Sequence, residues 1–266
     1  MIEKKISSLE ELTNEVNELN KLIQSSKGHE YQVLATLLFR GQSNAEWNLD
    51  TTLERYTDKK FSVFTYDGVL ESIYPATASL TGKEWPVDFR GFNQSNDFFS
   101  SPPNYSFMVY ARHHGFPTPL LDWSQSLYVA LFFAFQNADP QKDVAIFSYI
   151  EYLGGGKAGW VGAPQISAIG PYVASHKRHF IQQGQYTVCV KHDKSNNWIY
   201  CPHSEVLATS NDSTSDILYK FIMPGEIKNE ILQRLNEMNI NAYSLYASEE
   251  GLMESLAFKE LVLRNH

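Results

Sequence analysis

Apolar residues recur at helical spacing in two parts of the chain. In residues 7–24 they lie three or four positions apart, after a Ser–Glu pair at capping-box spacing. In residues 225–238 a second stripe follows Pro224, and Asn239 suits the left-handed conformation that ends many helices. These patterns predict one amphipathic helix in each segment.

Shorter apolar runs between turn residues predict buried strands. They cover residues 33–39, 143–150, 186–191 and 218–223. Residues 105–114 and 125–137 have a helical pattern, and the second segment is apolar on nearly all sides, so we expect it in the core. Because helices and strands are interspersed, the pattern predicts a mixed α/β or α+β fold.

Three stretches lack a clear period. Residues 43–104 hold scattered aromatic residues, four prolines and several glycines, which predicts short helices and ordered loops. Residues 153–171, with six glycines and two prolines, predict a long loop, and residues 209–216 a polar surface loop.

The composition allows a large core. The chain has 266 residues, of which 43% are apolar and 20% charged, and this excludes a disordered chain or a miniature disulfide scaffold. We expect one domain over residues 1–266. It would comprise an N-terminal helix within residues 1–30 and an α/β core over residues 31–266, with a variable insert at about residues 43–104.

The charge balance limits the partners. With 22 Lys and Arg against 30 Asp and Glu, the net charge is −8, so a nucleic acid would have to be met by a local basic patch. Cys189 and Cys201 have no zinc-ligand spacing, so we expect no metal and two reduced thiols. The first residues lack a signal-peptide core and residues 128–135 are too short an apolar run to span a bilayer, which predicts a cytoplasmic protein without a membrane partner.

The segment Phe39-Arg40-Gly41-Gln42 places an arginine at the end of an apolar strand. The guanidinium offers a planar fork to phosphate or carboxylate, the glycine lets a ligand approach the backbone, and the glutamine can donate and accept hydrogen bonds. An arginine paired with a core carboxylate beside a turn glycine is the equally simple structural interpretation.

The segment from His113 to Ser124, HHGFPTPLLDWS, concentrates polar and aromatic groups before the apolar helix. Asp122 or Ser124 can cap that helix while Trp123 packs in the core. A hydrolytic triad of Ser124, His114 and Asp122 lacks the usual nucleophile-elbow glycines, and a metal site lacks a supporting second cluster.

A dense positive run comprises His176, Lys177, Arg178 and His179, and a glutamine-rich turn containing Gln183 leads from it to Tyr186. The basic run can meet the phosphates of a nucleotide or nucleic acid, or be a solvated helix end. The turn can place an amide in a cleft, or be ordinary polar turn chemistry.

Taken in order, these segments resemble the FRG domain, a family named after its Phe-Arg-Gly motif. The resemblance includes FRGQSN, HHGFPTPLLDWS, DVAIFSY, RHFIQQGQYTV and the closing FIMPGEIKNEILQRLNEMNI. One departure is Pro119, where the family usually has arginine. The resemblance implies that the presumed cleft has lost a positive charge there.

The family is discussed as a remote relative of the ADP-ribosyltransferase fold, often in toxin or anti-phage settings. The resemblance therefore implies an ADP-ribosyltransferase-like mixed β core with flanking helices, and NAD as substrate. It assigns catalysis to Arg40, Asp122, Ser124 and Gln183, with Glu249 or Glu250 as other sources of a carboxylate. It assigns NAD contacts to Arg40, Gly41, Gln42, His113, His114, Trp123 and Tyr186. The positive charge of the basic run makes His176, Lys177 and Arg178 the candidates for nucleic-acid contacts.

Three functions compete for this sequence, and the resemblance favours the first. The first is a mono-ADP-ribosyltransferase that modifies RNA, DNA or protein, with an antitoxin protein as an implied partner. The second is a nuclease that uses His114 and Asp122, with or without a metal. The third is a non-enzymatic module that binds a nucleotide or peptide.

Overall fold

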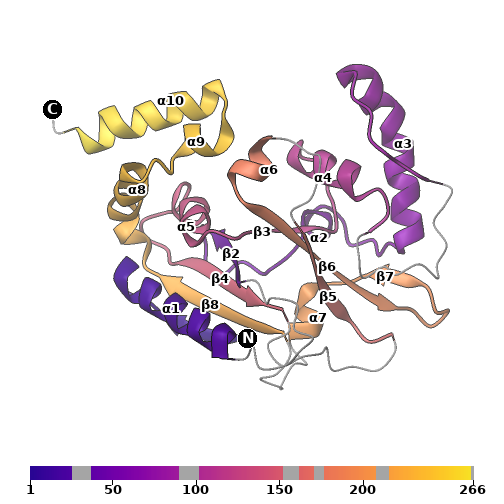
Figure 1. Ribbon diagram of the computed structural model, residues 1–266, viewed down its shortest axis with the longest axis horizontal. Helices are drawn as coiled ribbons and strands as arrows, with labels where there is room; N and C mark the ends of the chain where they lie inside the picture. The colour runs from indigo at the N-terminus through magenta and orange to yellow at the C-terminus, as the bar shows by residue number, and fades with distance from the viewer. Residues whose placement is uncertain (26–36, 90–101, 152–161, 171–176, 208–215, 265–266) are drawn as a thin grey trace.

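Eight strands among the described residues form one sheet (Figure 1). The computed structural model describes residues 1–25, 37–89, 102–151, 162–170, 177–207 and 216–264. The strands are β1 (Ile2–Lys5), β2 (Leu37–Gln42), β3 (Leu121–Ser124), β4 (Val144–Ile150), β5 (Gln165–Ile169), β6 (Gly184–His192), β7 (Trp198–Tyr200) and β8 (Ile217–Met223). Their order is β1-β8-β4-β2-β3-β6-β5, with β7 paired to β6. The β1–β8 pair is parallel and the other pairs are antiparallel.

Helices cover both halves of this sheet. They are α1 (Leu9–Ser25), α2 (Thr52–Tyr56), α3 (Val63–Thr81), α4 (Tyr105–His113), α5 (Leu127–Phe135), α6 (Lys177–Ile181), α7 (His203–Leu207), α8 (Lys228–Glu237), α9 (Ala242–Tyr246) and α10 (Glu249–Phe258). Short 3-10 and π turns cover Gly225–Ile227 and Lys259–Leu263. One core cluster joins α1, α5, α8 and α9 to β2, β4 and β8, and a second joins α3 and α4 to β5 and β6. The expectation of a mixed α+β fold is confirmed.

The long helices follow the hydrophobic pattern. Helix α1 buries Leu12, Val16, Leu19 and Ile23, as the spacing in residues 7–24 predicts. The helix predicted over 225–238 begins as a 3-10 turn and continues as α8, and Asn239 has the expected positive φ of 59°. The predicted helices at 105–114 and 125–137 correspond to α4 and α5, each somewhat shorter than expected.

The strand predicted over residues 33–39 differs in extent. Strand β2 runs from Leu37 to Gln42, and residues 33–36 lie outside the described part of the chain. The ladder with β4 continues to the pair Gln42–Ala145, so the backbone of Arg40 is paired on that side and Arg40 does not end the strand. The prediction that Arg40 stands at the strand end is therefore wrong by two residues.

Two stretches without a clear period contain more structure than predicted. Helix α3 has 19 residues, with Pro75 inside it, where short helices were expected. Strand β5 lies within the predicted loop 153–171, because pairing with β6 supplies backbone hydrogen bonds and Ile166 and Ile169 become buried. Strands β1 and β7 and helices α7, α9 and α10 were not predicted. The predicted loop at 209–216 lies outside the described residues except for Asp216.

Helix α5 lies directly on β2 at Gly41. A Cβ added to this glycine would lie 1.9 Å from the backbone oxygen of Ala130 and 2.6 Å from the backbone nitrogen of Ala134. Neither is the end of a flexible side chain, so neither can move aside without moving the helix. Gly41 is therefore needed because α5 packs closely on β2, and it is not the turn glycine of the structural interpretation given above.

Gly41→Ala should destabilise the protein by at least about 3 kcal/mol, because the added methyl group forces backbone away from backbone. Chemical denaturation measures this change. Gly68→Ala is the matched control, because a Cβ at Gly68 in α3 meets nothing within 4 Å. It should stabilise the protein by about 1 kcal/mol through helix propensity. Equal stability of the two variants would contradict the packing argument.

Candidate functional site

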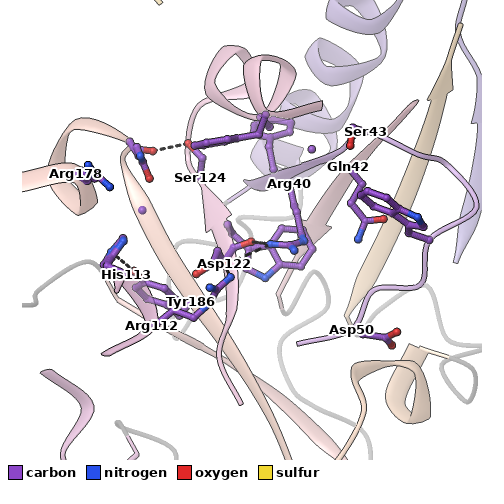
Figure 2. A pocket seen from close by; sticks show the side chains of 18 of the residues that line it. Arg40, Gln42, Ser43, Asp50, Arg112, His113, Asp122, Ser124, Arg178 and Tyr186 are labelled. Carbon is purple, nitrogen blue, oxygen red and sulfur yellow. Dashed lines mark hydrogen bonds and ion pairs between the residues drawn. The ribbon is translucent and has the colours of Figure 1, made fainter. Parts of the chain in front are cut away.

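A cavity of about 870 Å³ opens where β2 and β3 diverge. These strands pair at Phe39 and Ser124, whereas β3 pairs with β6 along all four of its residues. The cavity is lined by residues 39–42 of β2 and 122–124 of β3, and by parts of α4, α5, α6, β6 and α9 (Figure 2). Its volume falls within the roughly 300–1,000 Å³ of small-molecule sites.

The segment between α4 and β3 is held by neighbouring helices. Gly115 has a φ of 85°, which favours glycine, and turns the chain after α4. The backbone of Thr118 accepts a hydrogen bond from the backbone N–H of Leu53 and donates one to the hydroxyl of Thr52, at 3.1 and 3.0 Å. The Tyr66 hydroxyl donates to the carbonyl of Pro117 at 2.7 Å. These contacts hold the segment that leads into β3 against α2 and α3.

Arg40 lies at the bottom of the cavity, with 13% of its side chain exposed. Its Nη1 donates to the backbone oxygen of Asp122 at 2.8 Å and lies 3.8 Å from Oδ2 of the same residue. Burial lowers the pKa of Arg40 to about 10, while the negative charge of Asp122 opposes the shift. The guanidinium therefore stays charged at neutral pH. Arg40 has the internal carboxylate partner of the structural interpretation and also faces the cavity.

Arg112 is a second guanidinium that the sequence analysis missed. Its Nη2 donates to Oδ2 of Asp122, so Asp122 lies between Arg112 and Arg40 (Figure 2). Arg55 and Arg178 also line the cavity, so four arginines line it, and no lysine among the described residues does. Arg112 directly precedes the HHGFPTPLLDWS block, and that position was the available sequence signal.

Ser124 is buried at the end of β3. Its Oγ donates to the backbone oxygen of Gln182 at 2.7 Å and accepts from the N–H of Ser126 at 3.0 Å. Ser126, not Asp122 or Ser124, caps α5, because its Oγ accepts from the N–H of Val129. The hydroxyl of Ser124 therefore ties β3 to the glutamine-rich turn.

The structure places Gln182, rather than Gln183, in the cavity lining. Gln183 has a positive φ of 48° and its side chain is exposed, while its backbone oxygen accepts from the N–H of Gln125 at 3.0 Å. The left-handed backbone turns the Gln183 side chain outward. The expected grouping of Arg40, Ser124 and Gln183 side chains is therefore replaced by Arg40, Ser124 and Gln182.

The two adjacent histidines have different surroundings. His113 lines the cavity, and its Nε2 is 2.8 Å from the hydroxyl of Tyr186, which is 3.3 Å from Nδ1 of His179. Burial, and then the charge of Asp122, raise the pKa of Tyr186, so the phenol stays protonated. His114 is exposed and does not line the cavity. Partial burial, and then the positive charges of Lys83 and Arg178, lower its pKa. The His114–Asp122 arrangement that the nuclease interpretation needs is not brought together here.

Trp123 lines the cavity, while most of its side chain is buried in the core. Its Nε1 donates to the hydroxyl of Thr187 at 2.8 Å, and that hydroxyl lies 2.8 Å from Nε2 of His203. Since Thr187 accepts from Trp123, it donates to His203, and the proton of the neutral imidazole is then on Nδ1. The ring of Trp123 also packs against Tyr149, with the centroids 5.5 Å apart.

The remaining expected residues are only partly in the cavity. Arg178 lines it and donates from Nε to the backbone oxygen of Tyr246 at 2.9 Å, while His176 lies outside the described residues and Lys177 is described only as the first residue of α6. Glu249 and Glu250 are exposed and outside the cavity lining.

Pro119 does not line this cavity but a separate one of about 240 Å³ near Lys191 and Glu205. The expectation that Pro119 removes a charge from the cleft is therefore wrong.

The cavity mouth holds residues without a sequence signal strong enough to single them out. Trp47 is 55% exposed and lines the cavity with Glu46 and Asp50. Phe133 and Tyr246 add two aromatic side chains. The cavity thus combines arginines, carboxylates and flat rings.

Comparison with known proteins relates this cavity to a family. Residues 35–143 match the family model of the FRG domain. The matched span includes the Phe39-Arg40-Gly41 segment and the block from His113 to Ser124, so it supplies β2, β3, α4 and α5 of the site. Searches of curated proteins and of solved structures found no match.

Within the described residues, no group of three or more His, Cys, Asp and Glu side chains is positioned to hold a metal ion. The same part of the chain contains no helix that is both long and apolar enough to cross a membrane.

The pH dependence of the free energy of unfolding tests whether His203 is buried as a neutral imidazole. Burial, and then the charge of Arg40, lower its pKa to about 3, from 6.5. The unfolded chain therefore binds a proton that the folded protein does not, and stability falls as the pH drops below 6.5. Between pH 7.5 and 5, the wild type should lose about 2 kcal/mol more than His203→Gln.

Denaturant titrations at the two pH values measure this difference. His192→Gln is the control, because His192 is partly exposed whereas His203 is buried, and the variant should retain the wild-type pH dependence. If His203→Gln loses as much stability as the wild type, His203 is not the group responsible.

Proposed function

We propose that this FRG domain is a NAD-dependent mono-ADP-ribosyltransferase. The observation that carries the proposal is the cavity where β2 and β3 diverge, because it gathers Arg40, Ser124 and Gln182 from three distant segments of the chain. These residues supply a cation, a strand-borne hydroxyl and an amide in one place. This is the combination that the resemblance to ADP-ribosyltransferases implies, with Gln182 in place of Gln183.

The choice of cation supports a phosphate-bearing ligand. Guanidinium groups bind phosphate through two parallel hydrogen bonds, whereas lysine acts as a point charge. In a chain of net charge −8, four arginines line the cavity and no lysine does in the part of the chain that the structure describes. The pyrophosphate of NAD matches Arg40 and Arg112 in charge.

The rings at the cavity support a ligand with flat heterocycles. Trp47, Phe133 and Tyr246 line the cavity, and Trp47 is more than half exposed at its mouth. Aromatic side chains stack on bases through their faces. NAD presents two such rings, adenine and nicotinamide.

The proposed reaction breaks the bond between C1′ of the ribose and the nicotinamide nitrogen. The bonding electrons leave with nicotinamide, C1′ forms a bond to a nucleophile of the acceptor, and the nucleophile's proton passes to solvent. Positive charge develops at C1′ in the transition state, so a nearby carboxylate stabilises it. The cavity contains three carboxylates, Glu46, Asp50 and Asp122.

The biological setting rests on the resemblance to the FRG family. We propose a cytoplasmic bacterial toxin or anti-phage effector that modifies RNA, DNA or a protein and is restrained by an antitoxin protein. Arg178, at the cavity and within the basic run, is a contact for an anionic acceptor.

Arg40→Lys should reduce kcat/KM for nicotinamide release from NAD about 10- to 100-fold, because a bidentate contact is replaced by a single charge. Chromatography measures nicotinamide, and labelled NAD reports transfer to a lysate. Arg234→Lys is the matched control, since Arg234 lies on α8 with 66% of its side chain exposed and should turn over NAD as the wild type does.

Melting curves establish that each variant is folded. If Arg40→Lys does not fold, Arg112→Lys is measured in its place. Wild-type protein that neither releases nicotinamide nor transfers label would overturn the proposal. Equal activity of folded Arg40→Lys and Arg234→Lys would mean that Arg40 does not bind NAD as proposed.

A further inference from the structure

One carboxylate occupies the space between two guanidinium groups in the cavity. Oδ2 of Asp122 accepts a hydrogen bond from Nη2 of Arg112 and lies 3.8 Å from Nη1 of Arg40. Two positive charges thus share one negative charge. The side chain of Asp122 is 35% exposed, compared with 13% for Arg40 and 19% for Arg112, so the carboxylate is the most accessible member of the group.

The guanidinium donors are only partly used. The Nε atoms of Arg40 and Arg112 are buried and have no hydrogen-bond partner among the described residues. Leaving a buried donor without an acceptor is unfavourable, so a ligand that supplies acceptors gains from these groups. One aspartate therefore supplies fewer acceptor oxygens than the two arginines can bind, whereas a diphosphate supplies more.

An unused acceptor lies in the same cavity. Gln42 is 5% exposed and donates from Nε2 to the backbone oxygen of Asn48 at 3.0 Å, while its Oε1 has no partner within the described part of the chain. This oxygen can accept from a hydroxyl group. Unused donors on two arginines and an unused acceptor on Gln42 together match a ligand that carries both phosphate and sugar hydroxyls.

We propose that Arg40 and Arg112 form a binding site for the diphosphate of a nucleotide, and that Asp122 occupies this site until the ligand displaces its carboxylate. The ligand takes the donors of Arg112, and Gln42 accepts from a ribose hydroxyl. Asp122 then remains in the cavity as an unpaired carboxylate beside the ligand. This diphosphate site deepens the proposed function. Only the catalytic role of Asp122 rests on the proposed transferase activity.

The backbone allows this exchange without loss of the fold. Arg40 also donates to the backbone oxygen of Asp122, and this contact does not involve the carboxylate. The strand position is further held by the pairing of β3 with β6. The side chain of Asp122 can therefore leave Arg112 while β3 stays in place.

Asp122→Asn should bind ADP about tenfold more tightly than the wild type, because the competing carboxylate is gone. In the same variant, kcat for nicotinamide release should fall at least tenfold, because the charge that stabilises the transition state is also gone. Isothermal titration calorimetry with ADP and with inorganic pyrophosphate measures binding. Asp143→Asn is the matched control at an exposed aspartate and should behave as the wild type in both assays.

Gln42→Met tests the class of ligand. It should weaken ADP binding about tenfold and leave pyrophosphate binding unchanged, because pyrophosphate has no ribose hydroxyl. Equal weakening of both ligands would instead mean that Gln42 only supports the arginines, and would remove the sugar from the proposed site.

The outcomes separate this inference from the proposed function. Tighter ADP binding by Asp122→Asn, with no NAD turnover by any variant, would retain the diphosphate site and reject the transferase. NAD turnover by the wild type, with unchanged or weaker ADP binding by Asp122→Asn, would overturn the displacement of Asp122. If Asp122→Asn does not fold, Asp122→Ser is measured in the same way, and failure of both to fold would also overturn it, because the carboxylate would then be required by the fold.

Discussion

The close contact between α5 and β2 determines the shape of the site. Because Gly41 has no side chain, the backbone of α5 lies directly on the strand at Ala130 and Ala134. This contact holds one wall of the cavity rigidly. The opposite wall is β3, which meets β2 at Phe39 and Ser124 and then follows β6. The cavity forms because β2 packs against α5 and pairs with β4, while β3 pairs with β6.

The electrostatics of the site follow from this geometry. Arg40 lies in the gap between the diverging strands, where burial would penalise its charge without a counterion. Asp122 supplies the counterion from the other wall, and Arg112 adds a second positive charge. An ion pair between Arg40 of β2 and Asp122 of β3 thus bridges the gap at the bottom of the cavity. A ligand with more negative charge than one aspartate can compete for the same place.

The apolar pattern was enough to predict the helices with one buried face and the strands that are mostly buried. It predicted α1 and α8, and it placed β4, β6 and β8 to within two residues. It failed for α3, because Gly68 and Pro75 weaken the helical pattern of the sequence. The helix is nevertheless continuous and packs against other segments. The apolar pattern also failed for β5, because the edge strand depends on hydrogen bonds to β6 that no local pattern reveals.

The site was predictable by segment but not by side chain. The choice between Gln182 and Gln183 depends on a left-handed residue, and the role of Arg112 depends on a turn that brings α4 back to β3. In the FRG motif, three consecutive residues have three separate functions: Phe39 packs in the core, Arg40 carries the charge and Gly41 admits the helix. Strand alternation turns Arg40 away from its two neighbours, and this is why one short motif can serve both the fold and the cavity.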